Sequence, residues 1–205
     1  MLRNPLGVRV MRALLALLIL GFAATTAAAA GDPLFDATAA GDRAAVERAL
    51  ANGADVNSRA RDQATPLIAA VLGDRLAIVE LLLSNKADVK ARNSGGFTAL
   101  HAAAYSGSVP IAELLLEKGA VLEDAANKAG VTPLMVAVEE NHVAMLELLI
   151  ARGADINRPE SHGYTPVTRA GFKGNRDIIR VLKRHGAACP PAEVNGAWLC
   201  IEMSD

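Results

Sequence analysis

The residues that could do chemistry in this chain of 205 residues are few and widely separated. Its four histidines stand 41, 20 and 23 residues apart: His101, His142, His162 and His185. Structural zinc sites usually place at least two of their ligands within about five residues of each other, and these histidines do not. We therefore predict no metal site and no cofactor.

Three glutamates, Glu80, Glu113 and Glu147, recur at one position of a repeating pattern described below. Carboxylates brought close together could act as acid and base or bind calcium. Equivalent residues of stacked repeats, however, lie about one repeat apart, so we expect these side chains to be solvated. The sequence also contains no phosphate-binding loop and no nucleophile elbow. We therefore predict that the protein is not an enzyme.

The chain has two cysteines, Cys189 and Cys200, and both lie near its C-terminus. Their spacing is not the Cys-x-x-Cys of redox and zinc motifs. In an oxidising compartment we expect them to form a disulfide that closes a C-terminal tail, residues 188–205. Such a loop would contribute about 3 kcal/mol of stability. We expect the tail to fold back on the last repeat, with Trp198 supplying apolar area. A redox or metal-binding pair is the alternative.

The first thirty residues have the order of a signal peptide. Three arginines precede an apolar run over residues 13–22, and alanines follow at positions 28–30. Because small residues at those positions suit signal peptidase, we predict cleavage before Gly31 and a periplasmic or secreted mature protein. An uncleaved membrane anchor over residues 13–30 is the alternative.

The charge balance argues against nucleic acid and anionic lipid as partners. The whole chain carries 21 basic and 22 acidic residues, and residues 1–30 hold three arginines and no acid. The mature protein is therefore net acidic, whereas nucleic-acid-binding domains usually present a basic face. We expect it to bind no nucleic acid and, once the signal is removed, no membrane.

A motif of the type Thr-Pro-Leu recurs every 33 or 34 residues. Its copies begin at Thr65, Thr98, Thr132 and Thr165, and Asp32 starts a similar triplet 33 residues before the first. A second motif, Gly-Ala-Asp followed by an apolar residue, runs in phase with it and is complete at Gly53 and Gly153. Two patterns that share one period over five units indicate a repeat architecture.

Each unit contains the signals for two helices. Thr or Asp caps a helix and Pro suits its first position, so a first helix is expected after each Thr. Residues that tolerate a left-handed turn follow nine residues after the cap: Gly41, Asp74, Gly107, Asn141 and Gly174. A second helix then carries apolar residues at helical spacing. The sequence therefore predicts an all-α solenoid of five helix-turn-helix units with short β-turn loops.

The two end units carry polar residues where the inner units are apolar. These residues are Asp36 and Arg48 in the first unit and Arg169 and Lys183 in the last. A solenoid needs polar outer faces at its ends, so we interpret the five units as the whole array.

These motifs resemble those of the ankyrin repeat, a β-turn followed by two antiparallel helices, most closely in the unit that starts at Thr98. The resemblance covers residues 32–187 and implies an ankyrin-repeat domain over residues 31–187. Its repeats would span about 32–64, 65–97, 98–131, 132–164 and 165–187. The resemblance also implies a structural role for His101, in a hydrogen-bond network with the capping Thr and the loop backbone.

The resemblance further implies a monomer that binds a protein partner through its loop tips and the exposed side of its first helices. Mapping this surface by phase within the repeat gives twelve residues: Arg59, Arg61, Asp62, Phe97, Tyr105, Val131, Glu139, Glu140, His162, Tyr164, Phe172 and Lys173. The set includes four of the mature chain's five Phe and Tyr residues. Because aromatic residues often anchor interfaces, we interpret this surface as the binding site.

Two functions remain open from the sequence. The first is a periplasmic protein that binds and supports another exported protein, since similar small periplasmic ankyrin proteins are linked to oxidative-stress defence. The second is an immunity or inhibitor protein that neutralises a secreted enzyme or toxin, a role that other exported ankyrin proteins fill.

Overall fold

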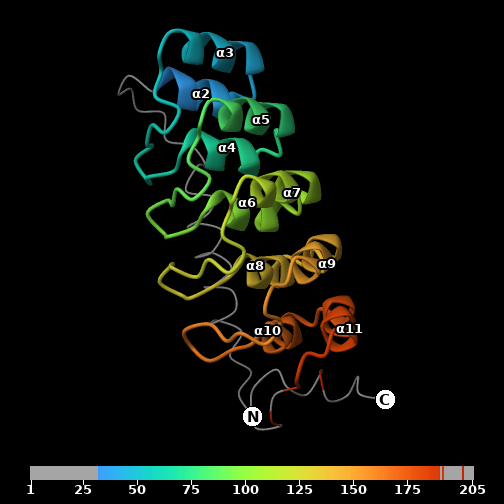
Figure 1. The fold of residues 1–205 in the computed structure, drawn as a ribbon. Coiled ribbons are helices and arrows are strands. Elements are labelled where there is room, and N and C mark those ends of the chain that lie inside the picture. Colours follow the sequence, from blue (N-terminus) through green and yellow to red (C-terminus); the bar gives the residue numbers. More distant parts are fainter. Residues whose placement is uncertain (1–31, 190, 192–199, 201–205) are drawn as a thin grey trace.

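The computed structural model describes residues 32–189, 191 and 200 (Figure 1). The predicted signal peptide and Trp198 lie outside these described residues. Within them the chain forms ten helices in five antiparallel pairs, stacked as a column. The pairs are α2 (Pro33–Ala40) with α3 (Arg43–Ala51), α4 (Pro66–Leu72) with α5 (Leu76–Ser84), α6 (Ala99–Ser106) with α7 (Val109–Glu117), α8 (Pro133–Glu139) with α9 (Val143–Ala151), and α10 (Pro166–Lys173) with α11 (Arg176–Arg184).

The first helix of each pair begins at the predicted cap. The Oδ1 atom of Asp32 accepts a hydrogen bond from the backbone N–H of Leu34 at 2.9 Å. In the same way the hydroxyls of Thr65, Thr132 and Thr165 accept from the backbone N–H three residues later, at 3.3–3.4 Å. These bonds satisfy backbone donors that a helix start leaves without a helical partner. The predicted starts of these helices are confirmed.

The turn inside each pair uses a left-handed residue, as predicted. Gly107 has φ 73°, and Asp74 and Asn141 adopt φ 52° and 62° without being glycine. Asp and Asn tolerate this region better than other non-glycine residues, because their short side chains can hydrogen-bond locally. Lys86, where other units have the Gly of the Gly-Ala motif, also adopts a positive φ, 68°.

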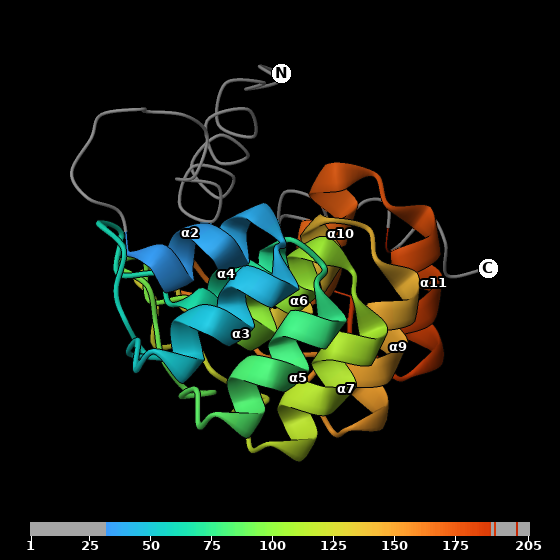
Figure 2. The same ribbon diagram turned by 90° about the horizontal axis from the view of Figure 1, so that it is seen from above.

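The core runs the length of the column between two layers of helices. First helices pack on first helices and second helices on second helices, from one end to the other (Figure 2). Equivalent apolar side chains fill the space, each at most 1% exposed: Leu34, Leu67, Leu100, Leu134 and Val167 from the first helices. Because each unit buries its apolar face only against its neighbours, the stack itself supplies the core.

Hydrogen bonds between equivalent residues tie successive units together. Nε2 of His142, just before α9, lies 2.9 Å from the carbonyl oxygen of Tyr105 in the preceding unit. The side-chain amide of Asn175, at the same place before α11, donates to the carbonyl of Val138 at 3.0 Å. The residues just before α9 and α11 are thereby linked to the first helix of the preceding unit.

The tail is fastened to the last unit. Cys189 and Cys200 form a disulfide, as predicted, with Cα atoms 5.7 Å apart. Cys200 is fully buried, and its carbonyl accepts a hydrogen bond from Nζ of Lys183 in α11 at 3.2 Å. None of the helices in the described part of the chain is long and apolar enough to cross a membrane.

Candidate binding surface

The loops that lead into the first helices project from one side of the column (Figure 1). Three of them are closed by a polar side chain at one position of the repeat: Asn93, Asn127 and Glu160. Each accepts from the backbone N–H four residues later, at 3.0 Å for both asparagines and 3.3 Å for the glutamate. These three residues were not predicted from the sequence, although their spacing of 34 and 33 residues is a signal that identifies them.

Neighbouring loops are also bonded to one another. The guanidinium of Arg59 donates to the carbonyl of Gln63 in its own loop at 2.9 Å and to that of Arg92 in the next at 2.7 Å. The N–H of Ser161 donates to the carbonyl of Ala129 at 3.0 Å. These bonds order the loops as one edge of the array, which suits a preformed binding surface.

His101 has the predicted structural role. The N–H of Thr98 donates to its Nδ1 at 3.2 Å, and its Nε2 lies 3.0 Å from the carbonyl of Val131. The ring therefore joins its own cap to the loop of the following unit. Burial lowers the pKa of His101 below its ordinary value, since the ring is removed from water.

Nine of the twelve predicted surface residues reach solvent. Four are exposed: Arg59, Arg61, His162 and Phe172. Five are half-buried: Asp62, Tyr105, Glu140, Tyr164 and Lys173.

The structure corrects the predicted surface at Phe97, Val131 and Glu139, which are only 4%, 2% and 6% exposed. Phe97 packs between Leu72 of α4 and Tyr105 of α6. All three are buried by contacts with a neighbouring unit or a loop. The position of a residue within a single repeat does not reveal such contacts.

Arg169 was predicted to form part of the polar outer face of the last unit, and this prediction is wrong because its side chain is buried. Its side chain is 4% exposed and lies between two carboxylates that are equally hidden. One guanidinium nitrogen bonds Glu139, and the other lies 3.4 Å from Oε2 of Glu160. The cluster joins α8, α10 and the loop between their units.

The two carboxylates of this cluster differ in their affinity for a proton. Burial raises the pKa of Glu139 above its ordinary value, and the charge of Arg169 only partly offsets this effect. Burial also acts on Glu160, but hydrogen bonds from His162 and the charge of Arg169 outweigh it and lower its pKa. Nδ1 of His162 lies 2.9 Å from Oε2 of Glu160, and the imidazole side chain is 69% exposed.

An aromatic pair lies next to the cluster. The rings of Tyr164 and Phe172 meet edge to face, with centroids 5.2 Å apart. Phe172 is 37% exposed, which is unusual for a large apolar side chain in the described part of this chain. We use the name C-terminal patch for the solvent-reaching residues around this pair: Glu140, His162, Tyr164, Phe172 and Lys173.

The recurring glutamates lie on the opposite layer, on the second helices. Glu113 pairs with Arg152 at 3.4 Å, and Glu147 with Arg184 at 3.1 Å, each arginine coming from the following unit. All four side chains are at least 36% exposed. Exposed ion pairs of this kind contribute roughly 0–1 kcal/mol, so these glutamates serve as solvated surface links.

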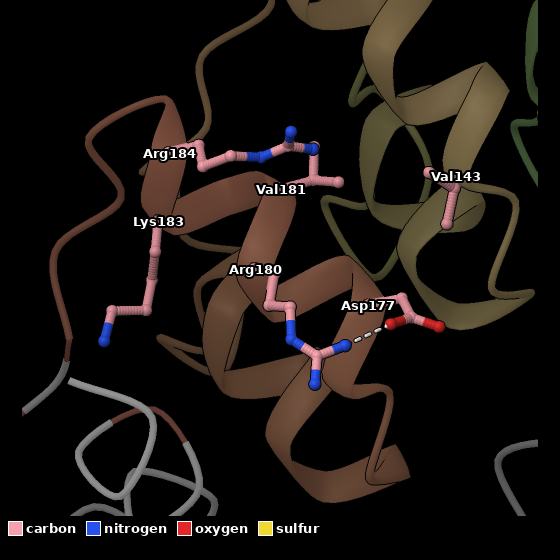
Figure 3. Close-up of a pocket in the computed structure, with 6 residues that line it drawn as sticks. All are labelled: Val143, Asp177, Arg180, Val181, Lys183 and Arg184. Atoms are coloured by element: carbon pink, nitrogen blue, oxygen red, sulfur yellow. Dashed lines mark hydrogen bonds and ion pairs between the residues drawn. The ribbon is translucent and has the colours of Figure 1, made fainter. Parts of the chain in front are cut away.

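A shallow pocket of about 540 Å³ lies on the same layer near the last unit (Figure 3). Val143 of α9 and Val181 of α11 contribute apolar wall, and the rest of its lining is charged. Arg180 pairs with Asp177 along α11, and the exposed fractions of their side chains are 61% and 71%. No group of three His, Cys, Asp or Glu residues suited to a metal ion occurs in the described ranges.

The comparisons with known proteins agree with this architecture. A family model described as ankyrin repeats in three copies matches residues 34–126, and one for ankyrin repeats in many copies matches residues 122–170. No curated protein matches the sequence. The two matches together span more than half of the chain and contain seven complete helices, α3 to α9, with all but the first residue of α2 and the start of α10. Ankyrin repeats are general protein–protein interaction modules, and this chain belongs to the ankyrin-repeat family.

Proposed function

We propose that this protein is an exported, non-catalytic monomer that binds another exported protein through its loops and first helices. The observation that carries the proposal is the Tyr164–Phe172 pair, which places aromatic surface in solvent beside a loop and helix fixed by buried ionic contacts. Exposed aromatic side chains on a rigid support are favoured anchors of protein interfaces, because little conformational entropy is lost when they are covered.

Two features support export. The order of charged, apolar and small residues over positions 1–30 is that of a signal peptide. The Cys189–Cys200 disulfide suits an oxidising compartment, since cytosolic thiols are kept reduced. Intact-mass measurement on protein from the native source tests this step. A chain that begins at or near Gly31 is expected, and a membrane-associated chain that retains Met1 would refute cleavage.

The binding surface is tested with matched double variants. A partner is first identified by crosslinking in the native compartment, and affinities are then measured by calorimetry. Tyr164→Ala with Phe172→Ala should weaken binding by a factor of about 30 or more, since an interface anchor typically contributes about 2 kcal/mol. Glu80→Gln with Glu113→Gln, on the second helices, should change the affinity little. Loss of binding in the glutamate pair alone would assign the partner to the opposite layer.

The consequence of binding separates the two biological settings. A protein that supports a partner, as in oxidative-stress defence, should preserve or raise that partner's activity and lifetime. An immunity or inhibitor protein should abolish the activity at equimolar ratio. Assaying the partner with and without this protein distinguishes them.

A further inference from the structure

We propose that the C-terminal patch binds an extended segment of the partner that presents a lysine or arginine beside an apolar residue. The inference rests on the proposed function and specifies the chemistry of the partner at that surface.

The negative charge of Glu160 is not needed to close its loop. At the equivalent positions Asn93 and Asn127 close their loops with a neutral amide, which accepts from the same backbone N–H. Glu160 makes that bond through Oε1 and adds a charge. The charge of Glu160 is therefore not needed to close the loop, and within the fold it pairs with Arg169.

Negatively charged side chains outnumber positively charged ones in and next to the C-terminal patch. Three carboxylates, Glu139, Glu140 and Glu160, meet two cations, Arg169 and Lys173. One negative charge is therefore in excess among these residues when histidine is neutral. Burial is the main cause of the raised pKa of Glu139, and the nearby negative charge of Glu140 adds to it.

The negative charge of Glu160 lies just beneath the surface of the patch. The carboxylate of Glu160 is buried, and the exposed ring of His162 covers it. A charge in such a setting is screened less by salt than a solvated one, so its field extends to the patch surface. The aromatic pair adjoins this charge directly, since the N–H of Tyr164 is bonded to Glu160.

A cationic side chain beside an apolar one fits the chemistry of this patch. A cation near the face of an aromatic ring is attracted by the ring as well as by a nearby carboxylate. The exposed part of Phe172 adds apolar area that an aliphatic or aromatic neighbour of the cation would cover. An acidic segment would meet the excess negative charge and be repelled.

The test uses the full-length mature protein with its disulfide intact. A library of random 12-residue peptides displayed on phage is selected on the wild-type protein, and the charge of the enriched peptides is counted. Enrichment of lysine or arginine beside apolar residues is expected, and enrichment of aspartate or glutamate would overturn the inference.

An enriched peptide is then synthesised with its lysine or arginine intact and with norleucine in that place. Both forms are titrated against the wild-type protein, Glu160→Gln, which keeps the loop-closing acceptor, and Glu117→Gln, an exposed control on α7. Glu160→Gln and the norleucine peptide should each weaken binding about tenfold, and their combination should weaken it little further, since coupled groups are not additive. The control should have no effect. If Glu160→Gln does not fold, Glu140→Gln takes its place in the cycle.

The outcomes separate the two proposals. Additive effects, or peptides selected without regard to charge, overturn the cationic segment while protein binding by this surface stands. Failure of every peptide to bind the wild-type protein overturns the cationic segment as well, whereas the proposed function is decided by the crosslinked partner.

Discussion

His101 joins two units through a single ring, because it contacts its own cap and the loop of the next unit. Buried side-chain hydrogen bonds of this kind each contribute about 1 kcal/mol, and an orphaned partner costs about 1–3 kcal/mol. His101→Gln should therefore lower the free energy of unfolding at pH 7.5 by about 2 kcal/mol or more, measured by urea denaturation.

The same residue predicts a dependence of stability on pH. Burial lowers the pKa of His101 below the ordinary value of 6.5, so the unfolded chain binds this proton more readily than the folded one. The stability that the neutral ring provides is complete above about pH 6.5 and is lost as the pH falls through that range. Wild-type protein should lose stability between pH 7.5 and 5.5, and His101→Gln should lose less. His185→Gln, an exposed control, should follow the wild type; equal slopes for all three proteins would contradict the prediction.

Residue roles could be predicted where they depend on local chemistry. Thr65 and Asp74 were identified because a cap needs a side-chain oxygen and a left-handed turn needs a tolerant residue. Glu139 and Arg169 were placed in solvent because charged residues are seldom buried without a partner. Glu139 and Arg169 form an ion pair although they are 30 residues apart and belong to two different units. The position of each residue within its own repeat does not reveal this pairing.

At the scale of the elements, the turn between α6 and α7 lies close against the following unit. Gly107 has φ 73°, and a Cβ atom there would lie 2.7 Å from Nδ1 of His142. Gly174 has φ 71° but no atom within 4 Å of such a Cβ. Gly174→Ala should therefore show only the cost of the left-handed backbone, about 1 kcal/mol. Gly107→Ala should add a steric cost of about 1–3 kcal/mol.

Thermal and urea unfolding of both variants measure this difference. Adding His142→Ala to Gly107→Ala should recover part of the steric cost, although that change also removes the bond to Tyr105. Equal destabilisation by the two glycine substitutions would show that the contact with His142 relaxes freely.

The buried ionic cluster holds α8, α10 and their connecting loop as one body. Arg169→Met would leave Glu139 and Glu160 buried without their cation, and removing one partner of such a pair typically costs about 3–5 kcal/mol. Arg180→Met removes an exposed pair with Asp177 and should cost less than about 1 kcal/mol. Urea denaturation compares them, and Glu139→Gln with Glu160→Gln should partly rescue Arg169→Met. A similar cost for the two arginine variants would refute the importance of burial.

The order of the helices was predictable because caps, turns and apolar spacing share one period. The hydrogen bonds between neighbouring loops could not be predicted from the sequence. One example is the bond from Arg59 to the carbonyl of Arg92 in the next loop. Those contacts depend on the distance between successive units, which is fixed by packing over the whole column and not by any one motif.

At the scale of the molecule, each unit touches only its neighbours, so a local change should have local effects. Replacing Cys189 and Cys200 with serine opens the loop between them and should lower the stability of the fifth unit by about 2–4 kcal/mol. Hydrogen exchange should then speed up in α10 and α11 and stay unchanged in α2 to α5. A uniform change along the column would mean that the array unfolds as one cooperative unit.

The unequal burial of the two ends has a consequence for the order of assembly. α3, in the first unit, buries only Val46, whereas α11 buries four apolar side chains, with the fastened tail beyond it. A growing chain emerges from its N-terminus, so the unit with the least apolar contact appears first and must wait for α4 and α5 to cover it. Both cysteines follow the five units in the sequence, so their pairing follows the assembly of the units rather than guiding it.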